Sequence, residues 1–131
     1  MTEETLGERI KAEMMVDHAN SLEKNFEIAK QIIKITRTGM VEVLNKEKLG
    51  GVEKIQVYLI GKRYAKEAGL VESEYVSSNE ICNELSLKGG SVRPWIKILR
   101  DSGEIESNGG GIAIKFNYIE SILKRVLRKN G

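Results

Sequence analysis

Apolar residues recur at intervals of three and four through several stretches of this chain, the spacing that places them on one face of a helix. The first stretch lies in residues 3–31, the second in residues 52–68, and the third runs from Asn117 to the C-terminal end. A shorter pair, residues 77–85 and 91–101, lies between the second and the third. The pattern predicts a mainly helical chain, with β structure confined to the segments between helices.

The N-terminal stretch is amphipathic but polar. Leu6, Ile10 and Met14 step by four, whereas the row that would continue a heptad holds His18 and Asn25. A long coiled coil is therefore not expected. The helix either packs across its own domain or makes a short contact with a copy of itself, and the sequence leaves both open.

Residues 32–44 have the composition of a β-hairpin. Isoleucine and valine are frequent on both sides of Arg37-Thr38-Gly39, which has the character of a turn. The alternative is that the first helix continues to Ile35. The segment that follows, residues 46–51, is polar, ends in two glycines and predicts a connection.

The second long helix ends in a clear signal. Gly69 follows its last periodic residue, as the left-handed cap of many helices does. Gly61 lies inside the helix, where glycine costs about 1 kcal/mol of helix stability relative to alanine. Because glycine has no side chain, it allows another helix to pack closely at that position. Lys62, Arg63 and Lys66 are predicted on the outside of the helix.

The central region carries start and stop signals for two short helices. Ser77 precedes Glu80 by three residues, which is the spacing of a capping box. Ile81 and Leu85 then share one face of the first helix. A turn follows over residues 86–90, where two glycines permit a sharp change of direction.

Pro94, the only proline, helps to place the start of the second short helix. Proline is tolerated in a first turn, where the N–H groups lack partners within the helix. The helix is therefore predicted to begin at Gly90 or Ser91. Its apolar side chains gather on one face, which is the predicted core face: Val92, Trp95, Ile96 and Leu99.

The outer surface of this second helix is basic. Arg93, Lys97 and Arg100 lie on an arc beside the apolar face, and no acidic residue occurs between Glu84 and Asp101. Cations arranged in this way suit phosphates and guanine edges. The plainer interpretation is that these side chains only solvate the helix, since 31% of the chain is charged.

A second hairpin follows the helix pair. Ile105 begins an alternating pattern, residues 108–111 (N-G-G-G) turn the chain, and Ile112, Ile114 and Phe116 return with a period of two. The apolar side of this hairpin is predicted to face inward.

The segment E-I-C-N-E-L-S-L-K-G-G-S-V-R-P-W-I-K-I-L-R-D-S-G-E-I resembles the helix-turn-helix and wing start of prokaryotic winged-helix transcription regulators. The matching positions are apolar or small residues at that pattern's spacing: Ile81, Cys82, Leu85, Val92, Ile96, Leu99, Gly103 and Ile105. Residues 58–70 are also similar to a segment of small archaeal proteins of this type.

This resemblance implies DNA contacts from the turn and the second short helix. Ser91, Arg93, Pro94 and Lys97 match DNA-contacting positions, and the expected set is completed by Lys88, Gly90, Arg100, Gly109 and Gly110. The first helix of such modules often touches the DNA backbone. The basic residues of helix 52–68 could therefore contact DNA, or they could simply be solvated at the surface.

The hairpin departs from the family pattern. Its tip has no arginine or lysine, and Glu104 and Glu106 precede it. A charged contact between this wing and DNA is therefore not implied, and only backbone N–H groups of the glycines are left there to meet a phosphate.

The predicted fold is mainly α with small β-hairpins (α+β). It consists of a winged helix-turn-helix domain over residues 46–131 and an N-terminal helix and hairpin extension over residues 1–45. The C-terminal helix carries a regular apolar stripe: Ile119, Ile122, Leu123, Val126 and Leu127. That stripe either closes the core of its own domain or faces a partner copy.

Composition narrows the class of protein. With 131 residues, 40% of them hydrophobic, the chain is expected to fold as one domain with an extension. The net charge of +2 is small, but residues 77–131 hold nine basic and six acidic groups. One cysteine, no long apolar run and an acidic start without a signal core predict a cytoplasmic protein that does not enter a membrane.

The sequence contains no catalytic constellation. It has one histidine, one cysteine and no phosphate-binding loop, so no enzyme, metal site, cofactor or small-molecule ligand is expected. The leading hypothesis is a homodimeric transcriptional regulator that reads the major groove of double-stranded DNA with helix 91–101. The alternatives are a winged-helix protein-interaction module and a plasmid or viral segregation or replication-initiator protein.

Overall fold

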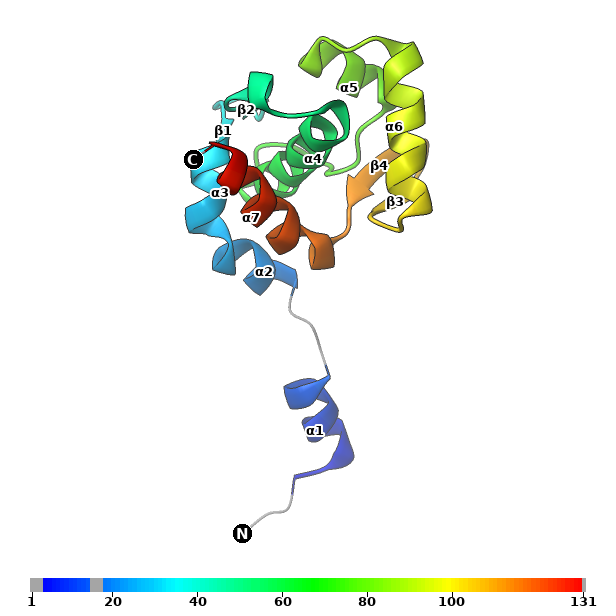
Figure 1. Cartoon of the computed structure of the whole chain (residues 1–131). Coiled ribbons are helices and arrows are strands. Elements are labelled where there is room, and N and C mark those ends of the chain that lie inside the picture. The colour runs from blue at the N-terminus through cyan, green and yellow to red at the C-terminus, as the bar shows by residue number, and fades with distance from the viewer. Residues whose placement is uncertain (1–3, 15–17, 131) are drawn as a thin grey trace.

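The computed structural model describes residues 4–14 and 18–130. The chain is mainly helical with two small antiparallel sheets, in agreement with the predicted α+β class. In Figure 1, α4 is surrounded by the other elements and α1 lies clear of them. The elements are α1 (Leu6–Glu13), α2 (His18–Lys24), α3 (Phe26–Ile32), β1 (Ile33–Ile35), β2 (Val41–Val43), the 3-10 turn η1 (Lys46–Lys48), α4 (Gly51–Glu67), α5 (Ser78–Leu85), α6 (Gly89–Asp101), β3 (Ile105–Asn108), β4 (Gly111–Ile114), η2 (Phe116–Tyr118) and α7 (Ile119–Asn130).

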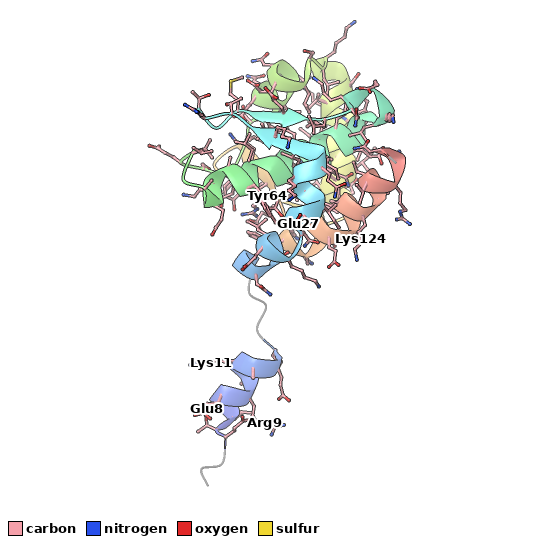
Figure 2. All side chains as sticks on the ribbon, turned by 90° about the vertical axis from the view of Figure 1, so that its left-hand side faces the viewer. Glu8, Arg9, Lys11, Glu27, Tyr64 and Lys124 are labelled. Atoms are coloured by element: carbon pink, nitrogen blue, oxygen red, sulfur yellow. The ribbon has the colours of Figure 1, made fainter. Side chains whose placement is uncertain are left out.

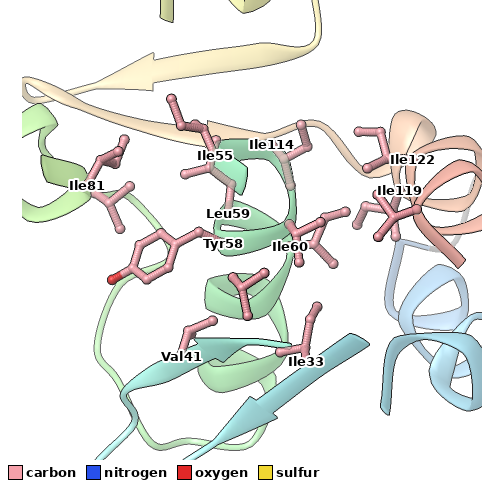
Figure 3. Packing of buried hydrophobic residues seen from close by; sticks show 14 of the residues in the cluster. Ile33, Val41, Ile55, Tyr58, Leu59, Ile60, Ile81, Ile114, Ile119 and Ile122 are labelled. Carbon is pink, nitrogen blue, oxygen red and sulfur yellow. The ribbon is translucent and has the colours of Figure 1, made fainter. Parts of the chain in front are cut away.

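Helix α4 is the centre of the core. Every residue from Ile55 to Gly61 is buried, so this part of the helix has no solvated side. A helix that is covered all round lies inside a fold rather than on its surface. Figure 3 shows Ile114 of β4 on one side of α4 and Val41 of β2 on the other, with Ile119 of α7 closing a third side. The elements that surround α4 therefore share one hydrophobic core.

The prediction of one continuous helix over residues 3–31 is wrong. Within the described residues this region forms α1, α2 and α3, and the last two meet at Asn25. The Asn25 side chain is buried and donates from Nδ2 to the Ser21 carbonyl oxygen at 2.8 Å. Asparagine competes in this way with the regular hydrogen bonds of a helix, which explains the break. Residue 3 and residues 15–17 of the predicted helix lie outside the described part of the chain.

The first hairpin is confirmed. β1 and β2 pair antiparallel, with Lys34 opposite Glu42. Gly39 turns the chain between them with a φ of 88°, a conformation that glycine adopts without strain. Because α3 ends at Ile32, the alternative in which the helix continues to Ile35 is excluded.

Gly61 of α4 lets this hairpin approach the helix axis. A Cβ atom built on Gly61 would lie 2.3 Å from Cγ1 of Val41 and 3.2 Å from Cγ2 of Ile33. The close packing predicted at this glycine is therefore made with a β-hairpin, not with a second helix.

The predicted cap at the end of α4 is confirmed. Gly69 has a φ of 73°, its N–H donates to the Lys66 carbonyl oxygen at 3.0 Å, and the Leu70 N–H donates to the Ala65 carbonyl oxygen at 3.0 Å. This pair of hydrogen bonds is the Schellman arrangement, which satisfies carbonyl groups that the helix leaves without donors.

Helix α7 closes the core of its own domain. Its stripe is buried against α3 and α4: Ile119, Ile122, Leu123 and Val126 are each no more than 1% exposed. Of the two alternatives for this stripe, the partner interface is therefore excluded. The helix begins two residues later than predicted, after η2, and Glu120 pairs with Lys124 at 2.8 Å.

Helix α5 starts as predicted but with half of the capping box. The Ser77 hydroxyl accepts from the Glu80 N–H at 3.1 Å. The Glu80 carboxylate turns to α4 instead, where it accepts from the Tyr58 hydroxyl at 2.6 Å and lies 3.3 Å from Lys62 Nζ. Burial raises the pKa of the Tyr58 hydroxyl, so this group remains a donor. The contact ties α5 to the central helix.

A single residue before α5 extends the second sheet. Val76 forms an isolated antiparallel bridge with Ile112 of β4, and the two residues exchange N–H···O hydrogen bonds of 2.9 and 2.8 Å. β4 also pairs with β3, from Ile105 opposite Ile114 to Asn108 opposite Gly111. The segment before α5 and the hairpin after α6 are thus joined side by side.

Candidate nucleic-acid interface

Helix α6 is held by its apolar face, as its sequence predicts. Val92 and Leu99 are 0% exposed and Ile96 is 7% exposed. Trp95 is half-buried against the start of α4, where a Cβ atom on Gly51 would lie 2.3 Å from its ring. The glycine therefore makes room for the indole, and the contact fixes α6 against the central helix.

The opposite face of α6 is exposed and basic. All seven predicted contact residues of the turn and α6 are exposed: Lys88, Gly90, Ser91, Arg93, Pro94, Lys97 and Arg100. Among the described residues, the side chains of Lys88, Arg93 and Arg100 make no hydrogen bond or ion pair. The structure thus brings these seven residues onto one side of the molecule with most of their charge uncompensated.

Lys97 differs from the other cations of this face. Its Nζ lies 2.9 Å from Oδ2 of Asp101, one helical turn later. Both side chains are well exposed, so the pair contributes only a few tenths of a kcal/mol and opens easily. The outer surface of α6 nevertheless includes one carboxylate at its C-terminal end, beyond the acid-free stretch noted in the sequence.

The start of α6 is open backbone. The helix begins at Gly89, earlier than predicted, with Lys88 as its N-cap, so Pro94 is the sixth helical residue and lies beyond the first turn in which it was predicted. Proline at that depth has no N–H for the Gly90 carbonyl oxygen four residues earlier. A Cβ atom on Gly89 or Gly90 would meet nothing within 4 Å. Backbone groups of this turn are therefore accessible to a ligand at the surface.

The second hairpin has the tight turn that its glycines predict. Gly109 and Gly110 have φ values of 56° and 85° and lie between the paired residues Asn108 and Gly111. Two consecutive positive φ angles match a two-residue turn of the I′ type, which suits the twist of a hairpin. Both turn residues are exposed, so their N–H groups are presented at the tip.

The two glutamates before this tip do not point a free charge outward. Glu106 accepts from the Tyr75 hydroxyl at 2.8 Å and from Arg63 Nη2 at 3.1 Å. The hydrogen bond from Tyr75, with the charge of Arg63, holds the pKa of the Glu106 carboxyl below its usual value. Glu104 accepts from Gln56 Nε2 at 2.7 Å. The acidic charge that the sequence placed beside the tip is thus directed toward the protein.

Arg63 is buried, and its predicted place on the outside of α4 is wrong. Its Nε and Nη2 both donate to the Ile114 carbonyl oxygen, at 3.0 and 2.8 Å, and Nη1 donates to Glu74 at 3.2 Å. Its guanidinium also lies 4.2 Å from the centroid of the Phe116 ring. Sequence reasoning missed this residue, although it continues the row of Ile55 and Leu59 at intervals of four.

Lys62 is also less exposed than predicted. Its side chain is 12% exposed and pairs with Glu80, whereas Lys66 is exposed as predicted. Of the three cations assigned to the outside of α4, only Lys66 is therefore free to face a ligand.

The described part of the chain contains neither a cluster of metal-binding residues nor a membrane-spanning helix. No group of three or more histidine, cysteine, aspartate or glutamate residues there could hold a metal ion. No helix among residues 4–14 and 18–130 has the length and apolar character needed to cross a membrane.

No protein-family model, curated protein or solved structure matches this chain. The geometry of α6 and the second hairpin is therefore the basis for any functional assignment.

Proposed function

We propose that this chain binds double-stranded DNA as a winged helix-turn-helix protein and reads the major groove with α6. The observation that carries the proposal is the exposed face of α6, where Arg93 and Arg100 have no partner within the described residues. A helix presented in this way, with its apolar side locked to the body, fits the width of the major groove.

The order of the elements supports the winged-helix assignment. A central helix (α4) is followed by a bridge residue (Val76), a helix pair (α5 and α6) and a two-stranded hairpin that pairs with Val76. The domain proposed over residues 46–131 contains all of these parts. The hairpin tip at Gly109 and Gly110 would contact the DNA backbone through N–H groups, since it carries no cation.

Each exposed group has a separate role in this proposal. Arg93 is suited to a guanine edge, because guanidinium groups bind the O6 and N7 acceptors in a bidentate manner. Lys88 and Arg100 lie near the two ends of α6 and would neutralise phosphates. Ser91 and the N–H of Gly90 would hold a phosphate at the start of the helix, where the helix dipole favours negative charge.

The chain would act as a homodimeric transcriptional regulator with two copies of α6. Two-fold symmetry of such a dimer predicts a roughly palindromic site, with half-sites spaced by about one helical turn or a multiple of it. Selection of bound sequences from random duplex DNA tests this prediction, and it also separates a regulator from a segregation or initiator protein, which would select repeated sites.

Exposed apolar surface on α6 supports a second candidate function. Ile98 is 53% exposed beside Pro94 and Lys97, and it would be part of a docking face if the chain were a protein-interaction module. On DNA the same side chain would instead meet a thymine methyl group.

Salt titration of duplex binding tests the proposal against this second candidate. If Lys88, Arg93, Lys97 and Arg100 each neutralise one phosphate, log K should fall with log salt with a slope of about −3 to −4. Fluorescence anisotropy with a labelled random duplex at increasing salt measures the slope. Absence of duplex binding at low salt, or binding that does not respond to salt, would remove the DNA assignment.

A further inference from the structure

Helix α1 carries an apolar stripe that the described chain leaves uncovered. Leu6, Ile10 and Met14 are 72%, 40% and 75% exposed, and no residue of α1 is buried. Figure 2 shows α1, with Glu8 and Arg9 on it, standing away from the body. A helix of eight residues is too short to be stable in water alone, even with the Thr5–Glu8 capping box at its start. Such a helix needs a surface to dock on.

The body presents an apolar groove of suitable size where α2, α3 and α4 meet. Leu22, Phe26, Tyr64 and Ala68 line it, and its volume is about 480 Å³. Phe26 is 50% exposed and separates this groove from a second hollow of about 190 Å³ along α3. The Tyr64 hydroxyl donates to the Leu22 carbonyl oxygen at 2.6 Å, which ties α2 to α4 and keeps the groove formed.

The charges beside the stripe and the groove are complementary. At helical spacing, Arg9 and Lys11 flank the apolar stripe of α1 on its two sides. Arg9 Nε lies 3.7 Å from Oε2 of Glu13, an exposed ion pair that opens easily. Glu23 and Glu67 line the groove, are exposed, and make no ion pair with another described residue. Lys11, which makes no ion pair with another described residue, and Arg9, when it leaves Glu13, are therefore opposite in charge to the two glutamates of the groove.

We propose that α1 of one chain docks in the groove of a second copy, which returns the same contact. Figure 1 shows α1 away from α2, α3 and α4, the helices that form the groove, and a single two-fold axis between two chains would cover both stripes and both grooves. Because each contact is made twice, the exchange doubles the apolar area removed from water, as a stable dimer requires. The inference does not depend on DNA binding, and it leaves α6 exposed on both copies.

Reciprocal charge reversal tests the exchange on the full chain without DNA. The variant Arg9→Glu/Lys11→Glu has an acidic stripe and an acidic groove, and the variant Glu23→Lys/Glu67→Lys has a basic stripe and a basic groove. For each variant alone, the Kd of the dimer should rise about tenfold or more, because like charges then face each other in both contacts. An equimolar mixture should form dimers again, because both contacts in the heterodimer are then matched.

Sedimentation equilibrium measures the masses against a monomer of 14.7 kDa. The matched controls Arg37→Glu/Lys48→Glu and Glu42→Lys/Glu47→Lys change the net charge equally at exposed residues outside α1 and the groove. These controls should remain dimeric. Far-UV circular dichroism of each dissociated variant should show a loss no larger than α1, since an undocked α1 is not stable. The controls should have the spectrum of the wild type.

The possible results separate this exchange from other arrangements. A mixture that restores the dimer supports docking between two chains. A wild-type monomer, which is the result if α1 covers its own groove, overturns the proposal. Variants that stay dimeric when tested alone, or a mixture that stays monomeric, would also overturn the proposal.

Discussion

At the scale of single residues, α6 is defined by which of its charged side chains have partners. Arg93 has none within the described residues, whereas Lys97 shares its charge with Asp101. Arg63, which was predicted on the outside of α4, donates hydrogen bonds to the Ile114 carbonyl oxygen and to two glutamates. Exposed cations without partners retain their full attraction for a polyanion, and a buried one does not contribute to it.

Replacement of Arg93 by alanine should weaken duplex binding by about 1–3 kcal/mol and relax the preference for guanine at one position. Stability should change by less than about 0.5 kcal/mol, because the side chain is exposed and unpaired. Anisotropy titrations on selected and scrambled duplexes measure both effects. The control Arg37→Ala removes an exposed cation from the first hairpin and should bind as the wild type does. Equal binding by Arg93→Ala on every duplex would contradict the assigned role.

Replacement of Asp101 by asparagine should tighten duplex binding by about 0.5 kcal/mol, because it removes a negative charge and frees Lys97. The same change in a Lys97→Ala background should have a smaller effect, since the ion pair is already absent. A double-mutant cycle from anisotropy data gives the difference. If Asp101→Asn weakens binding both in the wild type and in the Lys97→Ala variant, the Asp101 carboxylate does not repel DNA. The proposed orientation of α6 is then wrong.

At the scale of the elements, the position of each hairpin is set by one contact with α4. The first hairpin rests on Gly61, and the second is held by Arg63 two residues later. The two contacts differ in kind, since one is a close steric fit and the other is a set of hydrogen bonds to a carbonyl group and carboxylates.

Replacement of Gly61 by alanine should destabilise the fold by about 1–3 kcal/mol, although alanine is the better helix former. The added Cβ would lie 2.3 Å from Val41 Cγ1 and would push the hairpin outward. Adding Val41→Ala should recover part of the loss, which makes the two changes non-additive. Urea unfolding of the two single variants and the double variant measures the coupling. A gain in stability for Gly61→Ala alone would show that the hairpin is not in contact.

The second hairpin should loosen in acid. The pKa of Glu106 is lowered from its ordinary value of 4.5 by the hydrogen bond from Tyr75 and by Arg63. A carboxylate with a depressed pKa stabilises the fold above its unfolded pKa, and this contribution disappears as the pH falls through the folded pKa. The wild type should therefore be more stable than Glu106→Gln at pH near 7, and the difference should shrink below about pH 5.

Urea unfolding at several pH values measures this difference. The exposed Glu47→Gln serves as the matched control and should follow the wild type throughout. A Glu106→Gln deficit that stays constant down to about pH 3 would assign the effect to packing rather than to charge.

At the scale of the whole molecule, the described chain from α2 to α7 is built round one core, and α1 is the element outside it. The core includes Leu22 and Ile33 from the predicted N-terminal extension together with Leu59 of α4 and Leu123 of α7. Loss of any of these contacts should affect the whole cooperative unit.

Replacement of Leu123 by alanine should cost about 2–5 kcal/mol of unfolding free energy, because the side chain is 0% exposed in the core. The exposed Arg128→Ala on the same helix should cost less than about 0.5 kcal/mol. Urea unfolding measures the stability and sedimentation measures the mass. A Leu123→Ala chain with unchanged stability but half the mass would show that α7 is an interface after all.

Features that depend on residues close together in the sequence were predicted, and features that depend on distant residues were not. The cap at Gly69 and the turn at Gly109-Gly110 follow from neighbouring residues, so both were predicted correctly. The burial of Arg63 depends on Ile114, which is 51 positions away. The break at Asn25 arises where a buried amide shares the Ser21 carbonyl oxygen with the backbone N–H of the same residue, and the periodicity of apolar residues gives no sign of such a contact.

The packing of Trp95 against Gly51 gives this chain an intrinsic fluorescence probe. It is the only tryptophan, so all indole fluorescence comes from the contact between α6 and α4. Detachment of α6 would expose the indole to water and shift its emission to longer wavelength, while changes confined to α1 would leave the spectrum unaltered. Movement of the proposed reading helix can therefore be followed in the unlabelled native chain.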